Sequence, residues 1–188
     1  MSRDLLRTDE VKAIVRDAYG TVEAGTRQVA EKLYSPEELA LVPASAIDRA
    51  LGVANHLRHA ELGPDDVVLD LGCGAGIDTI LAARRAGRVI GLDFVPAMLA
   101  RTRDAAAEAG LSNVETLEGE IEAIPLPDAS VDHIVSNGVI NLSARKARVL
   151  AECARVLRPG GRLTVSDLTV EDEELPPEIL MHPATWAG

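Results

Sequence analysis

From residue 67 onward, short apolar runs alternate with longer amphipathic segments. Five of the apolar runs have the length and composition of buried strands: 67–71, 88–93, 114–117, 131–136 and 162–166. Three of the segments between them have helical spacing: 77–86, 96–109 and 144–158. This alternation predicts a doubly wound, Rossmann-like α/β fold with a parallel sheet of about five strands joined by right-handed crossovers.

The first third of the chain has helical patterns and no strand signal. Residues 9–33 have apolar positions at helical spacing, which Gly20 and Gly25 interrupt. Ser35 followed by Pro36 and two acids marks a helix start, and a further helix is expected at about 45–60. We therefore divide the chain into an N-terminal helical segment (1–62), a core (63–170) and an acidic C-terminal tail (171–188).

Composition and charge restrict the classes of partner. The formal net charge of −11 argues against a nucleic-acid partner, because phosphate binding requires clustered Lys and Arg. No apolar stretch approaches the roughly 20 residues of a membrane span, and the first residues are too polar for a secretory signal. Cys73 and Cys153 have neither disulfide nor metal-ligand spacing, so no metal is expected. These features predict a cytoplasmic protein that binds neither nucleic acid nor membrane.

The first predicted strand runs directly into a glycine-rich turn, Asp70-Leu71-Gly72-Cys73-Gly74-Ala75-Gly76. Glycines here allow a tight turn and a close approach of the backbone to a ligand. The dinucleotide fingerprint has glycines at the first, third and sixth positions, whereas the sixth position here is Ile77. A second acid, Asp93, ends the next strand, where it can accept hydrogen bonds from both hydroxyls of a ribose. Asp93 alone would also suit a nicotinamide dinucleotide, so an oxidoreductase remains an alternative.

Taken together, the acids and glycines resemble those of the class I methyltransferases that use S-adenosylmethionine. The resemblance implies that the backbone at Gly72 and Gly74, with Gly76 completing the turn and Asp70 close by, holds the methionine moiety. It implies ribose binding by Asp93. The remaining implied contacts are with adenine, from Phe94, Met98, Glu120 and the Ile121 amide, and with the ammonium group, from the carbonyls of Ser136 and Asn137. Each lies where a parallel strand ends, the edge at which open α/β sheets bind ligands.

Within this class the chain is most similar to the arsenite methyltransferases. The similarity includes Tyr34 to Leu39, Gly119 to Pro127, Ser136 to Ser143 and Pro183 to Gly188. That family holds trivalent arsenic with cysteine thiolates, which suit a soft centre. Here Val53 and Gly138 stand at two of the cysteine positions. We therefore expect a small organic acceptor rather than arsenite, with His56 as the candidate general base; a cofactor-binding homologue without catalysis is the alternative.

Class I methyltransferases usually complete the sheet with two further strands, and about 20 residues follow the fifth predicted strand here. We expect that strand to present an unpaired edge, which natural folds generally cover. A homodimer formed through this edge, or through the N-terminal helices, is therefore predicted.

Overall fold

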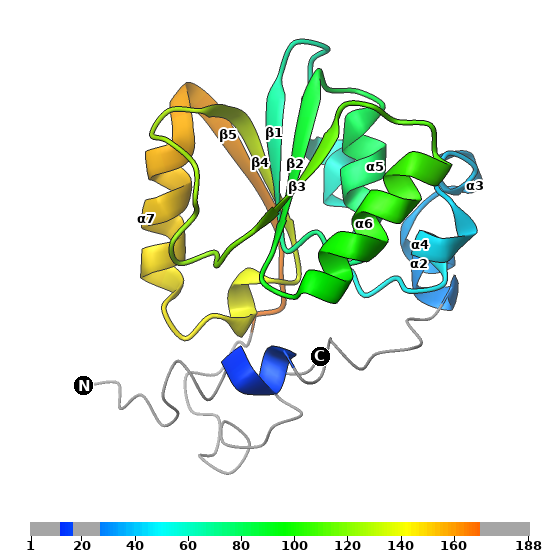
Figure 1. Ribbon diagram of the computed structural model, residues 1–188, viewed down its shortest axis with the longest axis horizontal. Coiled ribbons are helices and arrows are strands. Elements are labelled where there is room, and N and C mark those ends of the chain that lie inside the picture. Colours follow the sequence, from blue (N-terminus) through cyan, green and yellow to red (C-terminus); the bar gives the residue numbers. More distant parts are fainter. Residues whose placement is uncertain (1–11, 17–26, 170–188) are drawn as a thin grey trace.

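The computed structural model describes residues 12–16 and 27–169, and it has one five-stranded sheet at its centre (Figure 1). The strands are β1 (Val67–Leu71), β2 (Arg88–Asp93), β3 (Val114–Glu118), β4 (Val131–Asn137) and β5 (Leu157–Ser166). They lie in the order β3-β2-β1-β4-β5, and every neighbouring pair is parallel. The predicted doubly wound α/β fold is confirmed.

The strand order reverses between β1 and β4. The chain builds outward from β1 through β2 to β3, then returns to the opposite side of β1 to form β4 and β5. The connections that leave β1 and β4 therefore diverge, which opens a crevice at the carboxyl ends of these two strands.

Helices cover both faces of the sheet, as Figure 1 shows. One face carries α5 (Ile77–Ala83) and α6 (Pro96–Glu108), and the other carries α7 (Lys146–Val156). The buried residues form two clusters, one on each face, and β1 contributes Val68 to the first and Leu69 and Leu71 to the second. This alternation places Asp70 on the α5 face, beside the start of that helix.

Short helices precede β1. They are a turn at residues 12–16, α2 (Arg27–Leu33), α3 (Pro36–Leu39), α4 (Ala44–Ile47) and the 3₁₀ helix η1 (His56–His59). The predicted start of α3 is confirmed: the Ser35 hydroxyl accepts a bond from the Glu38 amide, and the Glu38 carboxylate accepts one from the Ser35 amide. Two helical stretches fall within the predicted 9–33 helix, and Gly20 and Gly25 lie outside the described residues.

The prediction of one helix at 45–60 is wrong. Only α4 and η1 are helical there, and the chain between them is a non-helical turn. The N–H groups of residues 48–50 still bond to carbonyls of α4, but those of Val53 and Ala54 bond to a distant side chain. The Asn137 amide accepts from the Val53 and Ala54 N–H groups and donates to the Ala54 carbonyl.

The last strand also differs from expectation. Strand β5 starts at Leu157, directly after α7, whereas the sequence predicts a start at Arg162. Leu157 already pairs with Val131, and the register shifts before His133 pairs with Arg162, so the Pro-Gly-Gly stretch is an irregularity within the strand. In the described part of the chain no strand pairs with the outer edge of β5, and Val165 is 40% exposed. Of the helices in residues 12–16 and 27–169, none is long and apolar enough to cross a membrane.

Candidate functional site

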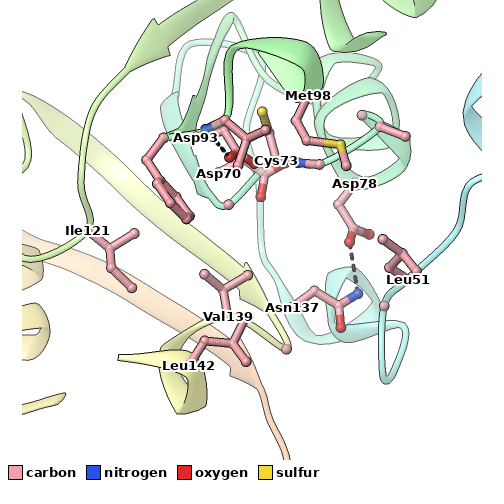
Figure 2. Close-up of a pocket in the computed structure, with 18 of the residues that line it drawn as sticks. Leu51, Asp70, Cys73, Asp78, Asp93, Met98, Ile121, Asn137, Val139 and Leu142 are labelled. Atoms are coloured by element: carbon pink, nitrogen blue, oxygen red, sulfur yellow. Dashed lines mark hydrogen bonds between the residues drawn. The ribbon is translucent and has the colours of Figure 1, made fainter. Parts of the chain in front are cut away.

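A pocket opens at the carboxyl ends of β1, β2 and β4, at the point where the strand order reverses (Figure 2). We call it the switch-point pocket. All but one of the predicted cofactor-binding residues line it: Asp70, Gly72, Gly74, Gly76, Asp93, Phe94, Met98, Glu120, Ile121 and Asn137. The sequence separates these residues by up to 67 positions, and the parallel sheet brings them to one edge.

The glycine turn directly follows β1 and lines the pocket. Gly72, Gly74 and Gly76 have φ values of 68°, 53° and 95°, a conformation that other residues rarely adopt. The Gly72 and Cys73 amides donate to the Leu92 carbonyl at 2.8 and 3.0 Å, which anchors the turn to β2. Above Gly74 the space is open, because an added Cβ would meet only the Gly72 carbonyl at 3.9 Å. The turn therefore presents its backbone to a ligand at close range.

Asp93 ends β2 and faces the glycine turn. Its two carboxylate oxygens accept hydrogen bonds from the Gly74 amide at 3.1 Å and the Val95 amide at 2.9 Å. Burial raises the pKa of Asp93, and the backbone N–H groups partly offset this effect. The carboxylate is thereby held in one orientation and can accept further hydrogen bonds on the pocket side.

Asp70 lies deeper than Asp93. It is 2% exposed, and its Oδ2 accepts a 2.6 Å hydrogen bond from the Thr79 hydroxyl. Burial, followed by the nearby charge of Asp78, raises the pKa of Asp70 to about 8. The raised pKa favours the protonated form of Asp70, which limits its use as an anion.

Phe94, Glu120 and Ile121 line the pocket, and the helical turn at residues 12–16 contacts two of them. The Lys12 ammonium is 2.6 Å from a Glu120 carboxylate oxygen, and the Arg16 guanidinium lies 5.5 Å from the centre of the Phe94 ring. Lys12 was not singled out by the sequence, because its partners are over a hundred residues away.

The pocket is also lined by Tyr34, Leu51, Asp78 and Asn137, and Figure 2 shows Asp78 bonded to Asn137 beside Leu51. The Tyr34 hydroxyl donates to one Asp78 oxygen at 2.8 Å, and the Asn137 amide donates to the other at 2.9 Å. The sequence resemblance implied a role for the backbone of Asn137 but none for Tyr34 or Asp78. The available signal for Asp78 was its position, as an acid in the first turn of the helix that follows the glycines.

Two predicted residues lie elsewhere. The Ser136 side chain is fully buried and does not line the pocket, because alternation along β4 turns it toward α7 while the Asn137 side chain faces the pocket. The contact expected of the Ser136 carbonyl stays a prediction. His56 is 3% exposed, does not line the pocket, and has no hydrogen-bond partner for either ring nitrogen among the described residues. Burial lowers the pKa of His56. The helix η1 packs against β4 and β5, which turns this ring into the interior.

Another part of the pocket wall is apolar. Val139 and Leu142 follow β4, and Figure 2 places them facing Ile121 across the opening. Beside this wall, a Cβ at Gly138 would lie 3.1 Å from a Val53 methyl carbon, so the two positions are in contact range. No group of three or more His, Cys, Asp or Glu side chains in the described ranges is arranged to hold a metal ion.

Comparison with known proteins agrees with this geometry. The family described as methyltransferase domain matches residues 62–187. An arsenite methyltransferase from Halobacterium salinarum is 40% identical over 158 residues, which are 82% of this chain and 40% of that protein. A malonyl-[acyl-carrier protein] O-methyltransferase from Methylococcus capsulatus is 37% identical over 125 residues, 65% of this chain and 45% of that protein. The chain thus spans less than half the length of these relatives.

A solved structure extends the comparison. The crystal structure of an arsenic(III) S-adenosylmethionine methyltransferase from Chlamydomonas reinhardtii superposes with a TM-score of 0.68 and 36% identity, covering 87% of this chain and 55% of that one. The fold and pocket define an α/β protein of the methyltransferase type. The chain belongs to the methyltransferase-domain family.

Proposed function

We propose that the switch-point pocket binds S-adenosylmethionine and that the protein transfers its methyl group to a small organic acceptor. One observation carries the proposal: three left-handed glycines at the end of β1 lie beside the Asp93 carboxylate at the end of β2. The open space above Gly74 leaves room for a ligand chain, and Asp93 is held where ribose hydroxyls could reach it. The similar Chlamydomonas reinhardtii structure is described as an S-adenosylmethionine methyltransferase, which supports the same cofactor.

The roles of the lining residues follow from their chemistry. Asp93 would accept from the ribose hydroxyls, Phe94 and Met98 would contact the adenine ring, and Glu120 would accept from its amino group. The bound cofactor supplies a methyl group on a positively charged sulfur. The chain contributes orientation, because methyl transfer from a sulfonium is a displacement in which alignment of donor and acceptor supplies much of the rate.

The apolar wall favours an organic acceptor. Val139 and Leu142 offer no ligand for a metal or metalloid, and Val53 lies directly beside Gly138 at the positions where the resemblance places cysteines. Trivalent arsenic requires soft sulfur ligands. We therefore propose an acceptor with an apolar body, methylated at an atom that the wall presents to the donor.

Calorimetric titration with S-adenosylhomocysteine tests the proposal. We expect saturable binding that Asp93→Ala weakens by about 1–3 kcal/mol, the range for hydrogen bonds to a charged group. Asp104→Ala, which removes an exposed acid from α6, is the matched control and should leave binding unchanged. Preferential binding of a nicotinamide dinucleotide would contradict the proposal. Binding of S-adenosylhomocysteine without methyl transfer to any acceptor would favour a non-catalytic homologue.

We also propose that the outer edge of β5 contacts a second copy of the chain. Val165 on this strand and Leu168 just after it are 40% and 62% exposed. A strand edge that nothing pairs within residues 27–169, with apolar side chains nearby, favours association. Sedimentation at increasing concentration should show a dimer. A monomer at the highest concentration would contradict this arrangement.

A further inference from the structure

Five carboxyl groups line the switch-point pocket, and their surroundings differ. Two of them, Glu120 and Glu122, lie 2.6 and 3.9 Å from the Lys12 ammonium. The other three are Asp70, Asp78 and Asp93, and none of these forms an ion pair with a Lys or Arg in the described part of the chain. Asp70 is occluded and bonded to Thr79, while Asp93 is bonded to backbone N–H groups beside the ribose position. Asp78 is half-buried at the opposite end from Ile121 (Figure 2).

Asp78 is held from both sides by uncharged donors. The Tyr34 hydroxyl bonds to its Oδ1 at 2.8 Å, and the Asn137 amide bonds to its Oδ2 at 2.9 Å. Tyr34 remains a donor because burial, together with the charge of Asp78, raises the pKa of its hydroxyl. Neither bond neutralises the carboxylate. Each oxygen keeps capacity for another hydrogen bond.

The orientation of Asn137 is itself determined by its other partners. Its side-chain oxygen accepts from the Val53 amide and from the Ser166 hydroxyl, both at 2.9 Å. Its nitrogen donates to the Ala54 carbonyl at 2.8 Å as well as to Asp78. Rotating the amide by 180° would place donors against donors, so the nitrogen must face Asp78. The carboxylate is consequently presented to the pocket in one rotamer.

We propose that Asp78 binds the α-ammonium group of S-adenosylmethionine, with Tyr34 and Asn137 as positioning residues. This inference rests on the proposed function. Figure 2 places Ile121 and Asp78 on opposite sides of the pocket, so if adenine lies against Ile121, the amino-acid end of the cofactor points toward Asp78. An ammonium group there would form a charge-assisted hydrogen bond with a carboxylate that is already oriented. Asp70 is the weaker partner because it is buried and already bonded to Thr79, and burial raises its pKa.

A pair of ligands isolates this contact. 5′-Methylthioadenosine has the adenine, ribose and thioether of S-adenosylhomocysteine but lacks its amino-acid group. Asp78→Asn is isosteric and can still accept from Asn137. We expect it to weaken S-adenosylhomocysteine about tenfold or more, the effect of losing a hydrogen bond to a charged partner. Its affinity for methylthioadenosine should change less than about twofold.

Two control variants accompany the test. Thermal unfolding checks that these two and Asp78→Asn are folded. Tyr34→Phe keeps the charge and removes one positioning bond, so its loss for S-adenosylhomocysteine should be smaller than that of Asp78→Asn. Asp70→Asn should have a smaller effect than Asp78→Asn. Equal weakening of both ligands by Asp78→Asn, or a larger loss from Asp70→Asn, would overturn the inference. Failure of the wild-type protein to bind either ligand would instead refute the proposed function.

Discussion

Val53, in the turn that follows α4, lies against Gly138, the residue directly after β4. A Cβ at position 138 would lie 3.1 Å from Val53 Cγ1, closer than ordinary packing allows. The valine methyl group thus occupies space that a side chain at 138 would need. A ligand that required a ligating side chain from each of the two positions would therefore meet an apolar contact instead.

This contact leads to a prediction about trivalent arsenic. The two cysteines of the chain are both buried, and burial raises the pKa of Cys73 well above its usual value and that of Cys153 to about 11. Burial and the raised pKa both disfavour the thiolate, the form that binds soft centres. We expect arsenite not to co-elute with the folded protein in size-exclusion chromatography. A thiol-reactive reagent should modify the two cysteines slowly until denaturant is added. Stoichiometric arsenic on the folded protein would contradict this.

Gly72 and Gly110 provide a matched pair for testing the glycine turn. Their φ values are 68° and 67°, but a Cβ at Gly72 would lie 2.5 Å from Val139 Cγ2, whereas one at Gly110 would meet nothing within 4 Å. Gly110→Ala should cost about 1–2 kcal/mol of unfolding free energy, the cost of the left-handed conformation, and leave ligand binding intact. Gly72→Ala should cost more and weaken S-adenosylhomocysteine about tenfold or more. Equal effects of the two substitutions on binding would argue against a ligand at the turn.

Glu152 connects α7 to the loop that follows Glu120. Its side chain is 7% exposed, bonds to the Ile124 amide at 2.9 Å and lies 2.7 Å from Arg155. The bond to Arg155 lowers the pKa of Glu152, so its stabilisation is present above the unfolded-state pKa and is lost on acidification. Glu152→Ala should reduce the unfolding free energy by about 2 kcal/mol or more, since it leaves a buried amide unpaired. Chemical denaturation at pH 7 measures this.

The control for Glu152 is Glu115, which pairs with Arg88 on the sheet surface. Both of these side chains are about half exposed, at 58% and 48%. An exposed pair contributes little, so Glu115→Ala should cost less than about 1 kcal/mol. If the two substitutions were equally destabilising, burial of the Ile124 bond would not be the cause.

Asp70 predicts an unusual pH dependence of stability. Its pKa is raised to about 8, so the folded state holds a proton that the unfolded chain loses near pH 4. The stabilisation is therefore present in full below the unfolded pKa and is lost as the pH rises toward and through about 8. We expect the melting temperature of Asp70→Asn to fall less between pH 5 and 9 than that of the wild type, by about 2 °C or more. Parallel profiles would show that Asp70 is ionised in the fold.

Much of the sheet and half of the site follow from local patterns. The runs at 67–71 and 88–93 are strands with the predicted bounds, because short apolar runs between turn residues have few other ways to bury themselves. Gly72 and Asp93 could be located from the sequence because a strand leading into a glycine turn, and an acid ending the next strand, are local features. The start of α3 at Ser35 is readable for the same reason: the bonds that begin it lie within four residues.

Only the tertiary structure decided the rest. The segment 48–55 lies within the predicted helix, yet at Val53 and Ala54 its backbone bonds to the Asn137 side-chain amide instead of to helical neighbours. Tyr34 and Asp78 are 44 residues apart, and Asp78 and Asn137 are 59 apart, so their meeting depends on the strand order. Local periodicity determines which segments become strands and helices, because it reflects which side chains each element can bury. Which polar groups meet at the pocket is set by long-range packing, which no short stretch of sequence contains.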